Sequence, residues 1–92
     1  MRSIYDPLYL ELISRLRRAR RSLRVTQGEL ASRLNKPQSY VSKIETAQRR
    51  LDLLEAAEWC AALGVAVNDV LPPEVLSTQR EQRSDDGKRT NH

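Results

Sequence analysis

The chain of 92 residues has one cysteine, Cys60, and one histidine, His92. A single thiol forms no intrachain disulfide, and these two side chains fall short of the ligand set of a structural zinc site. We therefore expect a protein without a metal or other cofactor. The scarcity of cysteine favours a reducing compartment, so a cytoplasmic location is expected.

Long apolar runs are also missing. No stretch approaches the roughly 18 consecutive apolar residues of a membrane-spanning helix, and residues 1–9 lack the apolar middle part of a secretory signal. Attachment to a membrane surface by the first expected helix is disfavoured, because its apolar stripe is needed for the core and no second anchor accompanies it. We expect no membrane partner.

The sequence offers little from which to build an enzyme. A chain with 39% hydrophobic residues and this length makes one domain and hides only about 60–65% of its unfolded surface, which leaves little for a deep cleft. Cys60 lies on an apolar face with no histidine partner, and Ser39 and Ser42 lack a neighbouring base. We expect no catalytic activity, and Cys60 is interpreted as a small buried apolar residue.

Charge of one sign is scarce in each of two successive segments of the chain. The first segment has few acidic residues, and the second has no basic residues. Residues 15–50 carry eleven Lys and Arg against two Glu, whereas residues 51–76 carry five Asp and Glu and no Lys or Arg. A positive block of this size favours a polyanion, either nucleic acid or an anionic membrane surface, while a solvated helix face is the ordinary alternative.

Start and stop signals predict the first two helices. Asp6 followed by Pro7 is typical of a helix start, because aspartate caps free N–H groups and proline at the first position loses no hydrogen bond. Apolar residues then recur every three or four positions up to residue 23. Thr26 and Glu29 have the spacing of a capping box, and Asn35 tolerates the left-handed conformation that ends the second helix.

The same signals predict three more helices. A third helix is expected from about residue 37 or 38 to 46, with Val41 and Ile44 facing inward. A fourth follows a capping box formed by Asp52 and Glu55 and ends at Gly64. A fifth, short helix is expected to begin at residue 68 or 69 and to stop before residue 72. Residues 77–92 show no apolar periodicity, so we expect a disordered tail there.

Residues 26–45, TQGELASRLNKPQSYVSKIE, resemble the helix-turn-helix of the Xre/Cro-type phage-repressor family, and the resemblance extends over about residues 12–71. Several independent positions carry it, namely Gln27, Leu30, Ala31, Asn35, Val41, Ile44 and Glu45. It implies an all-α fold, a compact five-helix lambda-repressor-like DNA-binding domain over residues 1–76, with the helix-turn-helix at about 26–46. Pro37 replaces the usual serine or threonine cap, and Ala47 replaces a glycine that commonly follows the closing glutamate.

The two apolar anchors of the third helix, Val41 and Ile44, turn its polar side outward, toward a groove about 12 Å wide if the partner is B-DNA. The resemblance implies that this side reads base edges through Gln38, Ser39, Ser42 and Lys43. Glutamine suits adenine, and lysine suits guanine. The predicted phosphate contacts are Gln27, Lys36, Tyr40, Arg49 and Arg50. The resemblance also implies a buried structural ion pair between Arg20 and Glu45.

These features predict a sequence-specific transcriptional regulator bound to double-stranded DNA. We expect a nucleoid-associated bacterial or phage protein, a dimeric repressor at an operator with two similar half-sites, because one small module buries only about 600–1,000 Å² on DNA. The expected dimer contact is the acidic segment from the fourth helix to Val75. The alternative is a protein-interaction or antitoxin-like module whose tail, residues 77–92, folds on a partner protein.

Overall fold

The structure is a computed structural model that describes residues 5–75. Five helices follow one another in the order α1 (Pro7–Ser22), α2 (Gln27–Leu34), α3 (Gln38–Glu45), α4 (Leu53–Leu63) and η1 (Val67–Asp69), and this part of the chain contains no strand. The all-α, five-helix prediction is confirmed. The predicted tail and its partner protein concern residues 77–92, which lie outside the described residues.

Side chains cap the helix starts as the sequence indicated. Asp6 Oδ1 accepts hydrogen bonds from the N–H groups of Leu8 and Tyr9 at 2.8 and 3.4 Å. Complete capping boxes begin α2, at Thr26, and α4, at Asp52. α3 begins after Pro37 without a side-chain cap. The helix boundaries are therefore set largely by residues next to them in the sequence.

All four α-helices end in the same left-handed turn. In each turn a residue with positive φ follows the helix, and the next N–H bonds to a carbonyl five residues back, which is the Schellman pattern. The left-handed residues are Arg24, Asn35, Ala47 and Gly64, with φ of 60°, 58°, 61° and 75°. The hydrogen bonds run from Val25 to Arg20, Lys36 to Ala31, Gln48 to Lys43 and Val65 to Cys60, at 2.7 to 3.1 Å. Glycine occupies this position in one turn of the four.

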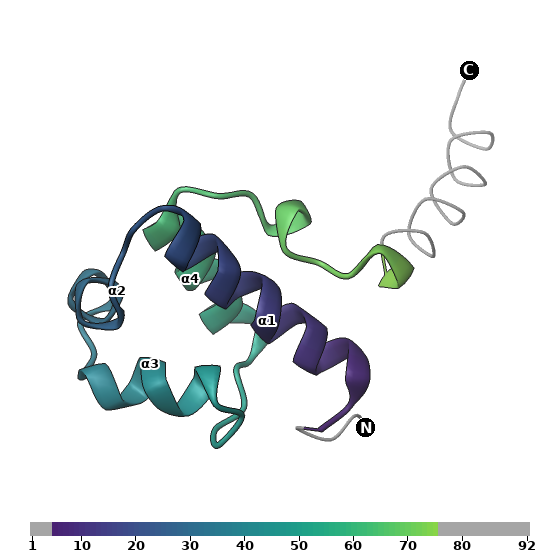
Figure 1. Cartoon of the computed structure of the whole chain (residues 1–92), viewed down its shortest axis with the longest axis horizontal. Coiled ribbons are helices and arrows are strands. Elements are labelled where there is room, and N and C mark those ends of the chain that lie inside the picture. Colours follow the sequence, from purple (N-terminus) through teal and green to yellow (C-terminus); the bar gives the residue numbers. More distant parts are fainter. Residues whose placement is uncertain (1–4, 76–92) are drawn as a thin grey trace.

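The core lies where α1, α3 and α4 meet and is closed by α2 (Figure 1). Its largest fully buried side chains are Trp59, Leu16, Leu30, Ile44 and Val41. Cys60 is buried among them, and burial raises the pKa of its thiol. Trp59 belongs to the core, because its ring is completely buried.

The fifth helix differs slightly from its prediction. η1 is a single 3-10 turn that begins at Val67, where the Asp69 carboxylate accepts from the N–H of Ala66 at 3.1 Å and so caps the start of the turn. None of the helices within residues 5–75 is long and apolar enough to cross a membrane.

Candidate nucleic-acid interface

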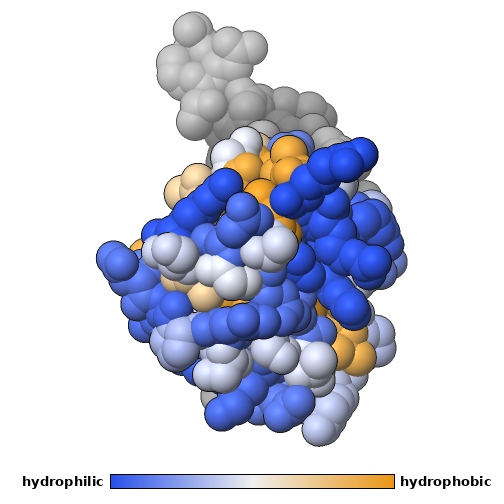
Figure 2. Space-filling view, turned by 60° about the vertical axis from the view of Figure 1, so that its left-hand side comes forward, coloured by the Kyte–Doolittle hydropathy of each residue, from blue (hydrophilic) through white to orange (hydrophobic). Residues whose placement is uncertain are grey.

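The polar side of α3 faces away from the core. Val41 and Ile44 are completely buried and fix the helix against the rest of the fold. Gln38, Ser39 and Lys43 are exposed and Ser42 is half-buried. The side of the molecule that carries α2 and α3 has a mainly hydrophilic surface (Figure 2). The structure thus brings the four predicted base-reading residues together on one short helix.

A chain of side-chain hydrogen bonds holds Gln38 in place. Its Nε2 donates to Gln27 Oε1 at 3.4 Å, and Gln27 Nε2 donates to Glu45 Oε1 at 3.0 Å. Gln38 therefore keeps its carbonyl oxygen and one amide hydrogen without a partner in residues 5–75. One acceptor and one donor, side by side, match the N6 and N7 edge of adenine in the major groove.

The ion pair expected between Arg20 and Glu45 is present under this chain. Arg20 Nε and Nη2 donate to the two carboxylate oxygens at 2.7 and 3.0 Å, and the side chains are 9% and 1% exposed. Arg20 Nη1 also donates to the carbonyl of Val25 at 2.8 Å. The pair thereby ties the end of α3 to α1 and to the turn before α2. No buried side-chain nitrogen or oxygen in the described residues lacks a partner.

Tyr40, one of the predicted phosphate contacts, packs into the core through its ring. The residue is buried, its hydroxyl accepts from Trp59 Nε1 at 3.3 Å, and the two ring centroids are 6.2 Å apart. Burial raises the pKa of Tyr40, which therefore stays neutral. The hydroxyl is thus engaged with Trp59 in this structure, and its contact with a phosphate stays a prediction. The spacing of Tyr40, Val41 and Ile44 along the helix was the available signal, because it places all three on one side.

Three predicted phosphate-binding cations lie against aromatic rings. Lys36 Nζ and the Arg49 guanidinium lie 5.3 and 5.0 Å from the centroid of the Tyr40 ring. The Arg50 guanidinium lies 4.8 Å from the centroid of the Tyr9 ring. Such cation–π contacts order long side chains while their charged ends stay at the surface.

Arg49 differs from the other two cations because it is paired. Its Nη1 and Nη2 donate to the Glu55 carboxylate at 3.2 and 3.0 Å. This hydrogen bonding lowers the pKa of Glu55 and raises that of Arg49. Lys36 and Arg50 have no carboxylate within ion-pair distance among residues 5–75. The charge of Arg49 is partly offset at its own site, which the sequence did not reveal.

Arg17 is a neighbour of this site that sequence reasoning did not single out. Its Nε lies 3.9 Å from Glu45 Oε1, although it comes from the middle of α1. The available signal was its position one turn before Arg20 on the same helix.

A tight pair of helices, α2 and α3, with buried anchors and an ordered polar outer side defines a helix-turn-helix regulator of the DNA-binding class. The model of the helix-turn-helix family matches residues 16–70. An XRE-family like protein from Pseudomonas syringae pv. tomato is 38% identical, with a TM-score of 0.69 over 86% of this chain and 90% of that one. The chain belongs to the XRE family of helix-turn-helix proteins.

Two further solved structures are similar. The hypothetical transcription factor NHTF from Neisseria is 30% identical, with a TM-score of 0.65 over 85% of this chain and 91% of that one. The restriction-modification controller protein C.AhdI from Aeromonas hydrophila is 26% identical, with a TM-score of 0.62 over 67% of this chain and 94% of that one. A search of curated proteins found no match.

Proposed function

We propose that the chain is a sequence-specific transcriptional repressor that reads an operator in the major groove of B-DNA with α3. The chain of hydrogen bonds from Glu45 through Gln27 to Gln38 is the observation that carries the proposal. A side chain fixed before binding loses less conformational freedom on binding, so its free donor and acceptor discriminate between bases more effectively.

The exposed side of α3 divides the reading among four side chains. Gln38 pairs with adenine, and Lys43 donates to guanine O6 and N7. Ser39 and Ser42 add less selective hydrogen bonds. The repressor role needs no additional surface, because a protein seated on an operator blocks access to it by occupancy alone.

Phosphate contacts position α3 without reading sequence. Lys36 and Arg50 supply unpaired positive charge, and Arg49 supplies a guanidinium that Glu55 already orders. The side-chain amide of Gln27 is engaged with Glu45 and Gln38, so its phosphate contact comes from its backbone N–H. That N–H lies in the first turn of α2, where it has no acceptor inside the helix.

The repressor acts as a dimer through the segment from α4 to Val75. This segment leaves apolar side chains uncovered, since Leu53 and Leu54 are 84% and 69% exposed and Val67 is also partly open. Two copies related by a two-fold axis present two α3 helices to two half-sites, which doubles the contact area of one module.

Selection of bound sequences from a random duplex library tests this function, followed by titration of the selected duplex and its single-base variants. Gln38→Ala should relax the preference at one base pair by about 1–3 kcal/mol and leave the other positions unchanged, because one bidentate contact is lost. Lys36→Ala is the matched control, and it should weaken all duplexes alike. A wild-type protein that prefers no duplex over random sequence would contradict the proposed function, as would unchanged preference in Gln38→Ala.

A further inference from the structure

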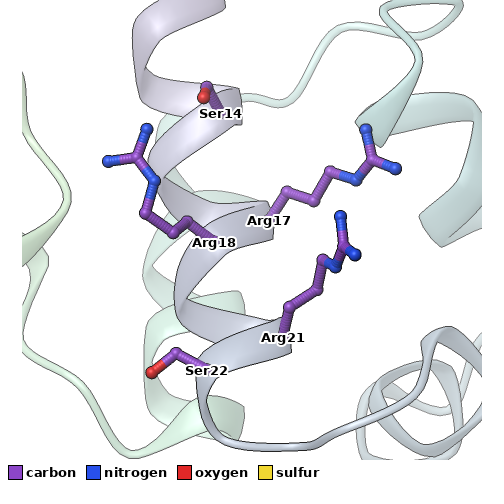
Figure 3. Close-up of a pocket in the computed structure, with 5 residues that line it drawn as sticks. All are labelled: Ser14, Arg17, Arg18, Arg21 and Ser22. Carbon is purple, nitrogen blue, oxygen red and sulfur yellow. The ribbon is translucent and has the colours of Figure 1, made fainter.

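The exposed side of α1 carries positive charge that the helix-turn-helix does not use. Ser14, Arg17, Arg18, Arg21 and Ser22 line an open hollow of about 540 Å³ (Figure 3). The chain has no acidic residue between Glu11 and Glu29, and Glu11 is paired with Arg15 at 2.8 Å. The arginines of the hollow therefore have no nearby carboxylate along their own helix.

Two of these arginines lie on the side where α3 ends. Arg17 is 50% exposed, and its contact with Glu45 places it beside the last residue of α3. Arg21 extends to the same side of α1 as Arg17, whereas Arg18 extends to the opposite side (Figure 3). Arg17 and Arg21 thus continue the surface formed by α3 and Gln27.

Interactions within the described part of the fold give Arg17 and Arg21 no strong partner. The Glu45 carboxylate already accepts three hydrogen bonds from Arg20 and Gln27, and Arg17 adds only a long contact of 3.9 Å. Arg21 has no ion-pair partner among residues 5–75. Like charges four residues apart on a helix repel each other, so this arrangement opposes helix formation unless an anion binds between them.

We propose that Arg17 and Arg21 bind phosphate groups of the DNA backbone beside the base pairs that α3 reads. This inference rests on the proposed function and extends the contact surface from the helix-turn-helix to α1. A guanidinium presents a planar fork of N–H donors that fits phosphate oxygens in a bidentate manner. Continuity with α3 through Glu45 favours DNA over an acidic protein as the occupant, because a duplex seated on α3 passes beside Arg17.

The experiment compares three full-length proteins on the duplex selected by the wild type. These are the wild type, the double variant Arg17→Gln with Arg21→Gln, and the control Arg18→Gln, which removes one charge from the same helix on the other side. Affinity is titrated between 50 and 200 mM salt, and phosphates are mapped by ethylation interference. Trp59 fluorescence, from the only tryptophan of the chain, checks that each protein is folded.

The double variant should bind on the order of tenfold more weakly at low salt, equally for selected and random duplexes. The slope of log affinity against log salt should fall by about 1.8, since each phosphate contact contributes about 0.9. Ethylation of at least one phosphate should weaken the wild type and Arg18→Gln but no longer affect the double variant. Sequence preference should be unchanged.

Two results would overturn the inference, and they are distinguishable from a failure of the proposed function. If the wild type selects an operator but the double variant shows the same slope and interference pattern as Arg18→Gln, α1 does not contact DNA and the hollow serves another anion. If the wild type prefers no sequence and Gln38→Ala changes nothing, the reading of DNA by α3 fails, and the α1 contact fails with it.

Discussion

Arg20 and Glu45 are the charged side chains that residues 5–75 bury, and each compensates for the desolvation of the other. The carboxylate also receives Gln27, which in turn holds Gln38. One ion pair in the core is therefore linked to a surface residue through two hydrogen bonds, of which the outer one is long at 3.4 Å. At the residue scale, the stability of the fold and the geometry of its outer side depend on the same carboxylate.

Arg20→Ala should lower the free energy of unfolding by about 3–5 kcal/mol, because it leaves Glu45 buried without its partner. Urea unfolding followed by the fluorescence of the buried Trp59 measures the loss. Arg18→Ala is the control and should change stability by less than about 0.5 kcal/mol, as exposed substitutions usually do. Equal losses in the two variants would mean that the pair contributes no more than a surface arginine.

At the scale of elements, the turn after α3 adopts a conformation that suits glycine, yet alanine occupies it. Ala47 has a φ of 61°, and the N–H groups of Gln48 and Arg49 bond to the carbonyl of Lys43 at 2.7 and 3.2 Å. The Schellman hydrogen bonds therefore hold the backbone in place against the steric preference of an L-residue. The connector keeps its path without the glycine that is common there.

Ala47→Gly should raise the free energy of unfolding by about 1 kcal/mol, because it relieves the steric cost of a left-handed Cβ at a smaller cost in chain entropy. The reverse change, Gly64→Ala at the end of α4, should destabilise the chain by a similar amount. A Cβ at Gly64 would meet no atom within 4 Å, so its effect would be purely conformational. Urea unfolding gives the free energy of unfolding of both variants. A loss of stability in Ala47→Gly would contradict the steric cost assigned to Ala47.

At the scale of the whole molecule, positive and negative charges come from different segments of the chain. α1, α2 and the connector before α4 carry most of the arginines, while α4 and the residues up to 75 carry acidic side chains. The two groups meet where Arg49 pairs with Glu55. A polyanion is attracted to the first group of segments and repelled by the second. The proposed dimer contact lies in the acidic segments, so most of the arginines belong to elements outside it.

A dimer of this kind should require two half-sites about one helical turn apart, since two α3 helices reach successive major grooves about 34–36 Å from each other. Inserting about five base pairs between the half-sites should reduce affinity to that of a single half-site, because it moves one of them to the opposite face of the duplex. Gel shifts with the two duplexes make the comparison.

The dimer itself is tested by sedimentation velocity on two variants. Val67→Glu lies in the proposed contact and should shift the protein to monomer, while Leu23→Glu, on an exposed residue at the end of α1, should leave it a dimer. Two results together would contradict the dimer. The wild type would be a monomer in free solution, and it would bind the duplexes with and without the inserted base pairs equally well.

The sequence by itself determined where the four α-helices begin and end and which side of α3 is free. Capping by Asp6, Thr26 and Asp52 acts within a few residues, and so does the left-handed turn at Asn35. Such interactions are complete inside one turn of helix, so a local pattern is sufficient to predict them. The pairing of Arg20 with Glu45 came from family resemblance, because nothing local joins two residues 25 positions apart.

Only the tertiary structure decided what the remaining side chains do. Tyr40 is a core residue because Trp59 arrives from α4 to occupy its hydroxyl, and Arg49 is partly neutralised because Glu55 turns back toward it. Arg17 adjoins α3 because α1 crosses the end of that helix. In each case the partner comes from another segment of the chain, and the tertiary fold places it next to the side chain. A short pattern fixes the direction of a side chain, while packing of distant segments fixes what it meets.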